Sequence, residues 1–269
     1  MDIEKIVINE MLCLGEGARK ILIEEIKKRN INKVLVVTDN SIYNAEANKK
    51  ITDLLDANEI KYIELNHTST KNAIDGLEIC KKEKTNFIIN VGGNYSIAIK
   101  MFGIEEQDNP ILTVIDTELV STINKHTVAI VGIGVLKQAI NGYIAKSKSI
   151  ISQMFLMKAI QLIYDNLEKA VNENDQEAIK KVGIGQCIAE MESSDNEIGI
   201  NHFMDRKNLS NELLNVAECD DEACYDEFRE ILTQAFHIDA ILFTKEETIK
   251  SLHECIENLS YEVGITEID

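Results

Sequence analysis

The stretch FIINVGGNYSIAIK, residues 87–100, joins a short apolar run to a glycine pair and then to a helical pattern that contains Lys100. Glycines let backbone amides approach a ligand closely, and the amino end of a helix favours negative charge, so this order suits a phosphate. A glycine pair alone is also typical of a tight turn that binds nothing. The stretch therefore predicts a strand followed by a candidate anion site at Gly92 and Gly93.

Further apolar runs of strand length stand on both sides of this one, with helical patterns between them. The runs cover residues 33–39, 61–65 and 111–116, and the helical patterns cover 18–30, 43–58 and 71–84. Apolar strands that alternate with helices are typical of a mostly parallel sheet flanked by helices. Residues 1–122 are therefore predicted to form an α/β domain.

From about Lys125 onward the sequence shows only helical patterns, with three apolar stripes at helical spacing. The stripes consist of Val135, Leu136, Ala139, Ile140, Tyr143 and Ile144, then Phe155, Ala159, Leu162, Ile163, Leu167, Ala170 and Val171, then Tyr225, Phe228, Ile231, Leu232, Ala235 and Phe236. Residues 123–269 are predicted to form an all-α domain. Composition does not mark the linker, which we place near residues 117–127.

The composition limits the classes of partner. The formal net charge is −18, from 28 basic and 46 acidic residues, so a nucleic-acid backbone would be repelled. The acidic surface either keeps the protein in solution or meets a basic protein partner. No apolar run is long enough to span a bilayer, and the first residues lack the layout of a signal peptide, so we expect a cytoplasmic protein without membrane contact. The six cysteines form no CxxC motif, which argues against a zinc ribbon or a thioredoxin-like site.

Taken in order, several segments resemble the iron-containing alcohol dehydrogenase family. Residues 14–40, LGEGARKILIEEIKKRNINKVLVVTDN, resemble the family's opening strand, Gly-x-Gly-Ala turn, helix and strand ending in Thr-Asp. NFIINVGGNYSIAIK resembles its phosphate loop, and LTVIDTELV resembles the segment that closes its nucleotide domain. Residues 130–171 resemble the first long helices of its metal-binding domain, and AEMESSDNEIGINHF resembles the later Gly-x-x-His helix.

This resemblance covers most of residues 12–203. It implies a Rossmann-like, dehydroquinate synthase-like N-terminal domain followed by an all-α domain that resembles the family's metal-binding domain. It also implies a dimer formed through N-terminal strands, which makes the segment IVINEMLCL a candidate interface.

The resemblance implies a metal site that this chain has mostly lost. The family holds a divalent metal with one Asp and three His, and the metal polarises the substrate oxygen. In VGIGVLKQAINGYIAK, residues 131–146, the Asp aligns with Gly134 and the first His with Gln138. The second His is retained as His202, and the third has no counterpart after Phe203. Because a catalytic metal usually needs at least three protein ligands, we expect the ordinary iron or zinc to be absent, and we assign no catalytic residue.

Two alternatives to this metal interpretation remain open. His202 is a hydrogen-bonded structural residue, or it belongs to a displaced metal site. The members of such a site would be Glu190, Glu192, Asp195, His202 and Asp205. His237 and Asp239 are interpreted as a helix terminus and not as a catalytic pair.

The resemblance also implies NAD(P) as cofactor, bound at a site where this chain keeps only some of the family's residues. The candidate cofactor-binding residues are Asp39, Gly92, Gly93, Asn94 and Lys100. Asp39 ends a strand, where an acid can accept hydrogen bonds from the adenosine ribose. In the phosphate loop, however, Val91 replaces the first Gly of the family pattern, Asn94 its Ser and Ile97 its Asp. We therefore expect a vestigial nucleotide site.

These observations favour a non-catalytic accessory, regulatory or scaffolding homologue, acting as a homodimer or beside a partner protein. The alternative is an NAD(P)-dependent alcohol or aldehyde oxidoreductase with altered or no metal dependence. Capture of another small anion at the glycine pair is a third hypothesis, since a fold does not fix a function.

Overall fold

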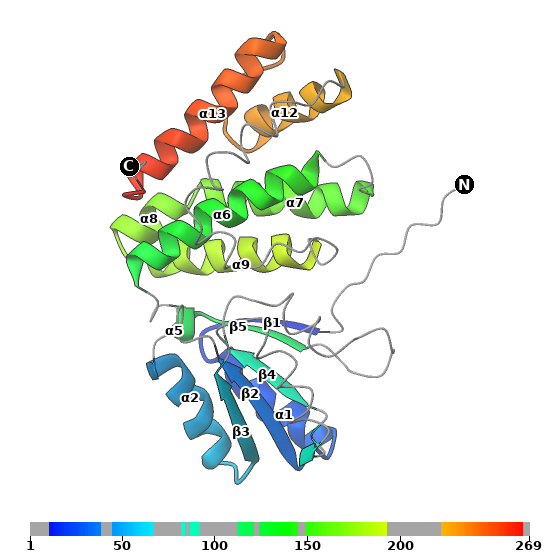
Figure 1. Ribbon diagram of the computed structural model, residues 1–269, viewed down its shortest axis with the longest axis vertical. Helices are drawn as coiled ribbons and strands as arrows, with labels where there is room; N and C mark the ends of the chain where they lie inside the picture. The colour runs from blue at the N-terminus through cyan, green and yellow to red at the C-terminus, as the bar shows by residue number, and fades with distance from the viewer. Residues whose placement is uncertain are drawn as a thin grey trace, which may run out of the picture. The chain divides into compact units, whose positions relative to one another are not determined.

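The computed structural model describes residues 11–38, 45–66, 82–83, 85, 87–91, 112–120, 124–144, 149–192 and 222–265. The chain divides into two compact units, Val7–Ile123 and Asn124–Asp269. The described strands all belong to the first unit, and every element described in the second unit is a helix (Figure 1). The predicted fold class, an α/β domain followed by an all-α domain, is confirmed.

The first unit is built on parallel strands. Its strands are β1 Met11–Gly15, β2 Lys33–Thr38, β3 Lys61–Asn66, β4 Ile88–Val91 and β5 Leu112–Asp116, and its helices are η1 Ala18–Lys20, α1 Ile21–Lys28, α2 Ala45–Asp56 and α5 Thr117–Val120. β2 lies between β3 and β4 and is parallel to both, while β1 and β5 form a separate parallel pair. All described strand pairs are therefore parallel, as the alternation of strands and helices predicts.

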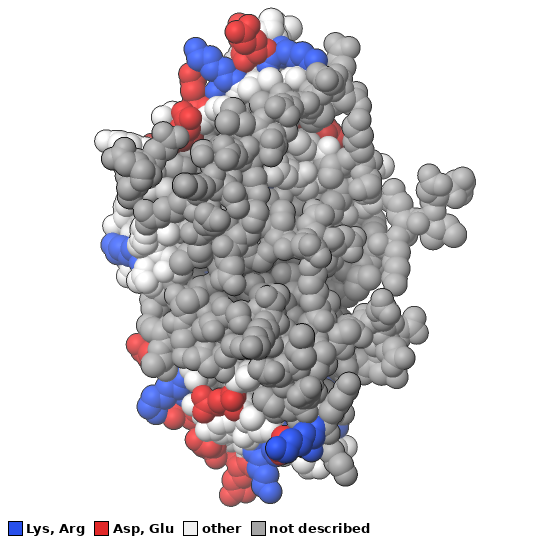
Figure 2. Space-filling view, in the orientation of Figure 1, with Lys and Arg blue, Asp and Glu red and all other residues white. Residues whose placement is uncertain are grey.

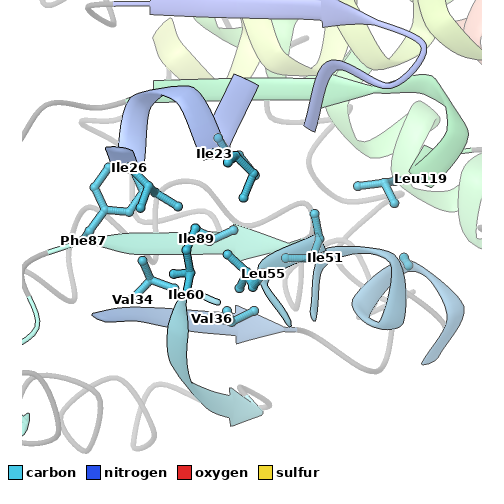
Figure 3. Close-up of a cluster of buried hydrophobic side chains, with 12 residues drawn as sticks. Ile23, Ile26, Val34, Val36, Ile51, Leu55, Ile60, Phe87, Ile89 and Leu119 are labelled. Atoms are coloured by element: carbon cyan, nitrogen blue, oxygen red, sulfur yellow. The ribbon is translucent and has the colours of Figure 1, made fainter. Parts of the chain in front are cut away.

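The core of the first unit explains why the central residues of β2, 34–37, are all apolar. Val34 and Val36 point to one face of the strand and Leu35 to the other, and all three side chains are fully buried. Strands of parallel sheets are commonly covered on both faces, which produces continuous apolar runs. Side chains from α1, α2, β2 and β4 gather in one cluster (Figure 3). Its members include Ile23, Ile26, Val34, Val36, Ile51, Leu55, Ile60, Phe87, Ile89 and Leu119.

The second unit is a set of packed helices. Their bounds are α6 Lys125–Tyr143, α7 Ile150–Tyr164, α8 Leu167–Asn172, α9 Gln176–Glu192, α12 Glu222–Gln234 and α13 Lys245–Glu262. The predicted apolar stripes are buried except for Ile144, Phe155 and Leu162, which are partly exposed. Across the described ranges, no helix combines the length and the low polarity that crossing a membrane requires.

Helix α6 is buried on nearly all sides, because α7, α8, α9 and α13 all contact it. A helix in this position needs apolar or small residues all round, not one apolar stripe. Gly132 meets this need: a Cβ placed there would lie 2.4 Å from Cδ1 of Leu167 on α8. Gly132 therefore has a packing role that the stripe analysis did not predict.

The charged surface mixes the two signs. On the face drawn in Figure 2, Lys and Arg side chains lie among Asp and Glu side chains. Exposed ion pairs such as Lys49–Asp53, with an Nζ–Oδ2 distance of 2.7 Å, also bring opposite charges together on the surface. Pairs as exposed as this one contribute little to stability.

Candidate functional site

The two predicted ligand positions on α6 are both buried. Gly134 and Gln138 are four residues apart, so they lie on one face of the helix in successive turns. Glycine offers no side-chain donor, and the amide of Gln138 is neutral. Helix α6 contains no Asp or Glu, and its only histidine, His126, is exposed in the first turn. Catalytic divalent metals are held by carboxylate, imidazole and thiolate groups, so this face of α6 does not fit one.

A buried lysine on the same helix was missed by the sequence analysis. Lys137 precedes Gln138 and is buried to a similar degree. Burying an ammonium group is unfavourable unless it is compensated, so a lysine in this position is unusual. The only signal in the sequence was a lysine inside the apolar run GIGVLKQAI. A lysine side chain is not among the groups that ordinarily hold a catalytic divalent metal.

The remaining predicted metal residues are not among those whose side chains the structure describes. His202, Asp195 and Asp205 lie outside the described residues, as do the side chains of Glu190 and Glu192. Within the described parts of the chain, no three His, Cys, Asp or Glu side chains come together as a metal ion would require.

His237 is paired with a residue other than its sequence neighbour Asp239. Its Nε2 lies 2.9 Å from Oδ1 of Asp165, at the end of α7. His237 follows the end of α12 and has a φ of 59°. Its position is that of a residue at a helix terminus, where such a backbone conformation is common.

Hydrogen bonds fix both ends of α6. At the amino end, the Asn124 side chain accepts a bond from the Thr127 amide at 2.8 Å. At the carboxyl end, the Tyr143 hydroxyl donates to Oε2 of Glu230 on α12 at 2.6 Å. Burial, reinforced by Glu230, raises the pKa of Tyr143, so the hydroxyl stays a donor at neutral pH. The face that carries Gly134 and Gln138 is therefore part of an anchored helix.

The strands of a candidate nucleotide site end at one common edge. Thr38, the last residue of β2, pairs with Asn66 of β3 and with Val91 of β4. In open α/β sheets, nucleotides bind outside the carboxyl ends of parallel strands such as these. Asp39 directly follows β2 and Gly92 directly follows β4 in the sequence.

The structure does not describe the predicted cofactor-binding residues that would follow these strands. Asp39, Gly92, Gly93, Asn94 and Lys100 all lie outside the described residues. Their roles therefore stay predictions.

A buried carboxylate anchors the turn after β1, and the sequence analysis missed this role. Asp116 pairs with Gly15 across the β1–β5 ladder. Its carboxylate accepts bonds from the Gly17 and Arg19 amides, each at 3.1 Å, and from Nη1 of Arg19 at 2.6 Å. The Glu118 amide donates to it as well, at 3.0 Å. The only signal was the acid at the end of LTVID.

Glycines are needed in this turn for a backbone reason. Gly15 and Gly17 have φ values of 136° and 73°, which other residues rarely adopt. The arrangement fixes the Gly-x-Gly turn to the end of β5.

Two family models match this architecture. The iron-containing alcohol dehydrogenase model matches residues 9–100, and the C-terminal model of the Fe-containing alcohol dehydrogenase family matches residues 128–212. The chain belongs to the iron-containing alcohol dehydrogenase family. The resemblance seen in the sequence is thereby confirmed. The C-terminal match begins inside α6 and includes Gly134, Gln138 and His202.

Relatives of known activity in this family are oxidoreductases. The chain is 22% identical over 262 residues to lactaldehyde reductase of Escherichia coli (strain K12), covering 74% of this chain and 68% of that protein. It is 32% identical over 114 residues to NADPH-dependent butanol dehydrogenase of Clostridium saccharobutylicum, covering 42% of this chain and 29% of that protein.

Solved structures support the fold. A 1,3-propanediol oxidoreductase superposes with a TM-score of 0.78 at 18% identity, covering 99% of this chain and 88% of the other. The iron-containing alcohol dehydrogenase from Thermococcus thioreducens gives a TM-score of 0.72 at 16% identity, with coverages of 98% and 87%.

Proposed function

We propose that this member of the iron-containing alcohol dehydrogenase family does not carry out the family's metal-dependent reaction and acts as an accessory, regulatory or scaffolding homologue. The observation that carries this proposal is the buried face of α6 with Gly134 and Gln138, the two positions that the family resemblance aligns with an acid and a histidine. In hydride transfer to or from an alcohol, the metal polarises the reacting oxygen. Its loss removes several kcal/mol of transition-state stabilisation, at the order of magnitude found for electrostatic catalysis.

The retained packing around α6 supports the same proposal. Gly132, Ala139 and Ile140 are buried in the helical core, and both ends of the helix are fixed by hydrogen bonds. A helix kept for its packing while its ligand positions change is what a non-catalytic role predicts.

The proposal is tested by metal analysis of purified protein after incubation with ferrous or zinc ions, together with an assay for alcohol-dependent NAD(P)H formation. We expect substoichiometric metal and no NAD(P)H formation. One metal per chain together with alcohol-dependent turnover would refute the proposal.

A second candidate is an NAD(P)-dependent oxidoreductase with altered or no metal dependence. The common carboxyl edge of β2, β3 and β4 favours it, because nucleotides bind at such an edge. A related sulfoacetaldehyde reductase from Bifidobacterium kashiwanohense, with a TM-score of 0.70, was solved in complex with NAD+.

Titration with NADH or NADPH, followed by fluorescence, tests the second candidate. The second candidate requires saturable binding that Asp39→Ala weakens. The matched control Asp53→Ala changes an exposed acid of α2 and should leave binding unchanged. No binding at millimolar nucleotide would count against the second candidate.

A further inference from the structure

Two exposed apolar patches lie on the second unit, outside the candidate site. The tip patch consists of Ile241 and Leu242, whose side chains are 71% and 92% exposed. The α7 patch consists of Ile150, Ile151 and Met154 in the first turns of α7, with Ile150 at 77% and Met154 at 68% exposure. Single exposed apolar residues are ordinary, but groups of large ones mark interaction surfaces.

The tip patch lies on a hydrogen-bonded turn between α12 and α13. The Phe243 amide donates to the Ala240 carbonyl at 3.0 Å, which places Ile241 and Leu242 at the centre of the turn. Arg229 of α12 donates from Nε to the Phe243 carbonyl at 2.9 Å, and Ala240 is fully buried beneath the turn. Turn centres usually hold Gly, Asn, Asp or Pro. This turn instead presents two aliphatic side chains to solvent in a fixed position.

The rim of the tip patch is acidic. Asp239, Glu246 and Glu247 are all exposed next to the turn. The one lysine among residues 239–247 is Lys245, whose Nζ lies 4.2 Å from the centre of the Tyr225 ring. The tip patch therefore combines an apolar centre with a net negative border.

The α7 patch carries a positive charge at one end. Ile150, Met154 and Lys158 are spaced four residues apart and follow one face of α7, with Ile151 beside them. Lys158 is exposed and is the only charged residue of the helix. Gln153 of α7 donates to Glu227 of α12 at 3.1 Å, so the positive charge is confined to the Lys158 end, and this end complements the acidic rim of the tip patch.

We propose that the tip patch of one copy docks on the α7 patch of a second copy of this chain. Apolar surface then meets apolar surface, and the acids beside the tip approach Lys158. Charge complementarity of this kind selects the partner surface, and two acidic tips would repel each other. The acidic rim also disfavours an anionic membrane as the occupant. The contact joins two different surfaces of the chain. It therefore adds copies one after another, unless a two-fold axis lets the same two copies make the contact twice and form a closed dimer.

Sedimentation velocity of the full chain, over a wide range of concentrations and at low and high salt, tests this contact. The wild type should self-associate reversibly, and more weakly at high salt, because salt screens exposed charges. Leu242→Gln and Met154→Gln should each weaken association about tenfold, since each removes a large apolar side chain from the contact. Lys158→Glu should also weaken it. The matched control is Tyr261→Gln, which changes a 74% exposed residue of α13 outside both patches and should have no effect.

A mixing experiment then identifies the two partners of the contact. Leu242→Gln keeps an intact α7 patch, and Met154→Gln keeps an intact tip patch. Labelled Leu242→Gln protein should therefore associate with unlabelled Met154→Gln protein, although each alone associates weakly. Far-UV circular dichroism confirms that both variants are folded.

Three results would overturn the proposal. The first is a wild type that stays monomeric at every concentration. The second is association that neither substitution weakens, which places the interface elsewhere, for example at IVINEMLCL. The third is a mixture that associates no better than its parts.

Discussion

Asp116→Ala should lower the stability of the first unit strongly, because it removes a buried carboxylate that four donor groups share. The carboxylate accepts from the amides of Gly17, Arg19 and Glu118 and from the Arg19 guanidinium. Breaking a buried ion pair costs about 3–5 kcal/mol. Arg19 keeps an ion pair with Glu118, so its charge is not left unpaired. The low end of the range, about 3 kcal/mol, is therefore expected, most of it from amides that lose their acceptor.

The assay is urea unfolding followed by far-UV circular dichroism. Hydrogen exchange on peptides covering residues 11–28 locates the effect in the turn after β1. The matched control is Asp226→Ala, which removes an i, i+3 ion pair to Arg229 from an acid that is 73% exposed. An exposed pair of this kind contributes less than about 0.5 kcal/mol. If both variants lose the same stability, or if exchange after β1 is unchanged, the reasoning about Asp116 is wrong.

Three further predictions concern the helical unit. Gly185→Ala should destabilise it by about 1 kcal/mol, because overpacking outweighs the gain in helix propensity. The new Cβ would lie 2.8 Å from Cγ1 of Ile163 and 3.1 Å from the Ala159 carbonyl oxygen. A higher melting temperature for Gly185→Ala than for the wild type would contradict the predicted loss of stability. Thr244→Ala should cost about 1 kcal/mol by removing the cap of α13. Bonds from the Thr244 amide and hydroxyl lower the pKa of Glu247, and alanine removes only the hydroxyl. The part of the loss that comes from this hydroxyl is therefore full at neutral pH and shrinks as pH falls through the lowered pKa, while the part from the Glu247 amide does not change with pH. A variant as stable as the wild type at neutral pH would refute the capping account. Burial raises the pKa of Cys255, so iodoacetamide should label this thiol only after unfolding. Rapid labelling of Cys255 in the native protein, located by peptide mass spectrometry, would contradict this prediction.

β2 and β3 were predictable because their signal is local. The apolar runs at 33–39 and 61–65 correspond to β2 Lys33–Thr38 and β3 Lys61–Asn66, within a residue at each end. Turn-forming and charged residues border both runs, so the residues next to each strand mark where it begins and ends.

The start of α1 could not be predicted from its own residues. The pattern over residues 18–30 predicts one helix, whereas the structure has a short 3₁₀ turn at Ala18–Lys20 before α1. Asp116 binds the amides of Gly17 and Arg19 from far along the chain, and this non-local contact accompanies the tighter turn.

Burial of α6 was also only partly predictable. Periodicity identified its apolar stripe, but four neighbouring helices bury Gly134, Lys137 and Gln138 as well. The predicted ligand positions could be assigned in the sequence only through the family resemblance. The structure adds that two of them lie in a packed interior, while the position of His202 is outside the described residues.

The most direct test of the central claim is the metal content of the purified protein after incubation with ferrous or zinc ions. The α6 face with Gly134 and Gln138 predicts substoichiometric metal that is removed by buffer exchange. One tightly held iron or zinc per chain, accompanied by alcohol-dependent NAD(P)H formation, would contradict the account.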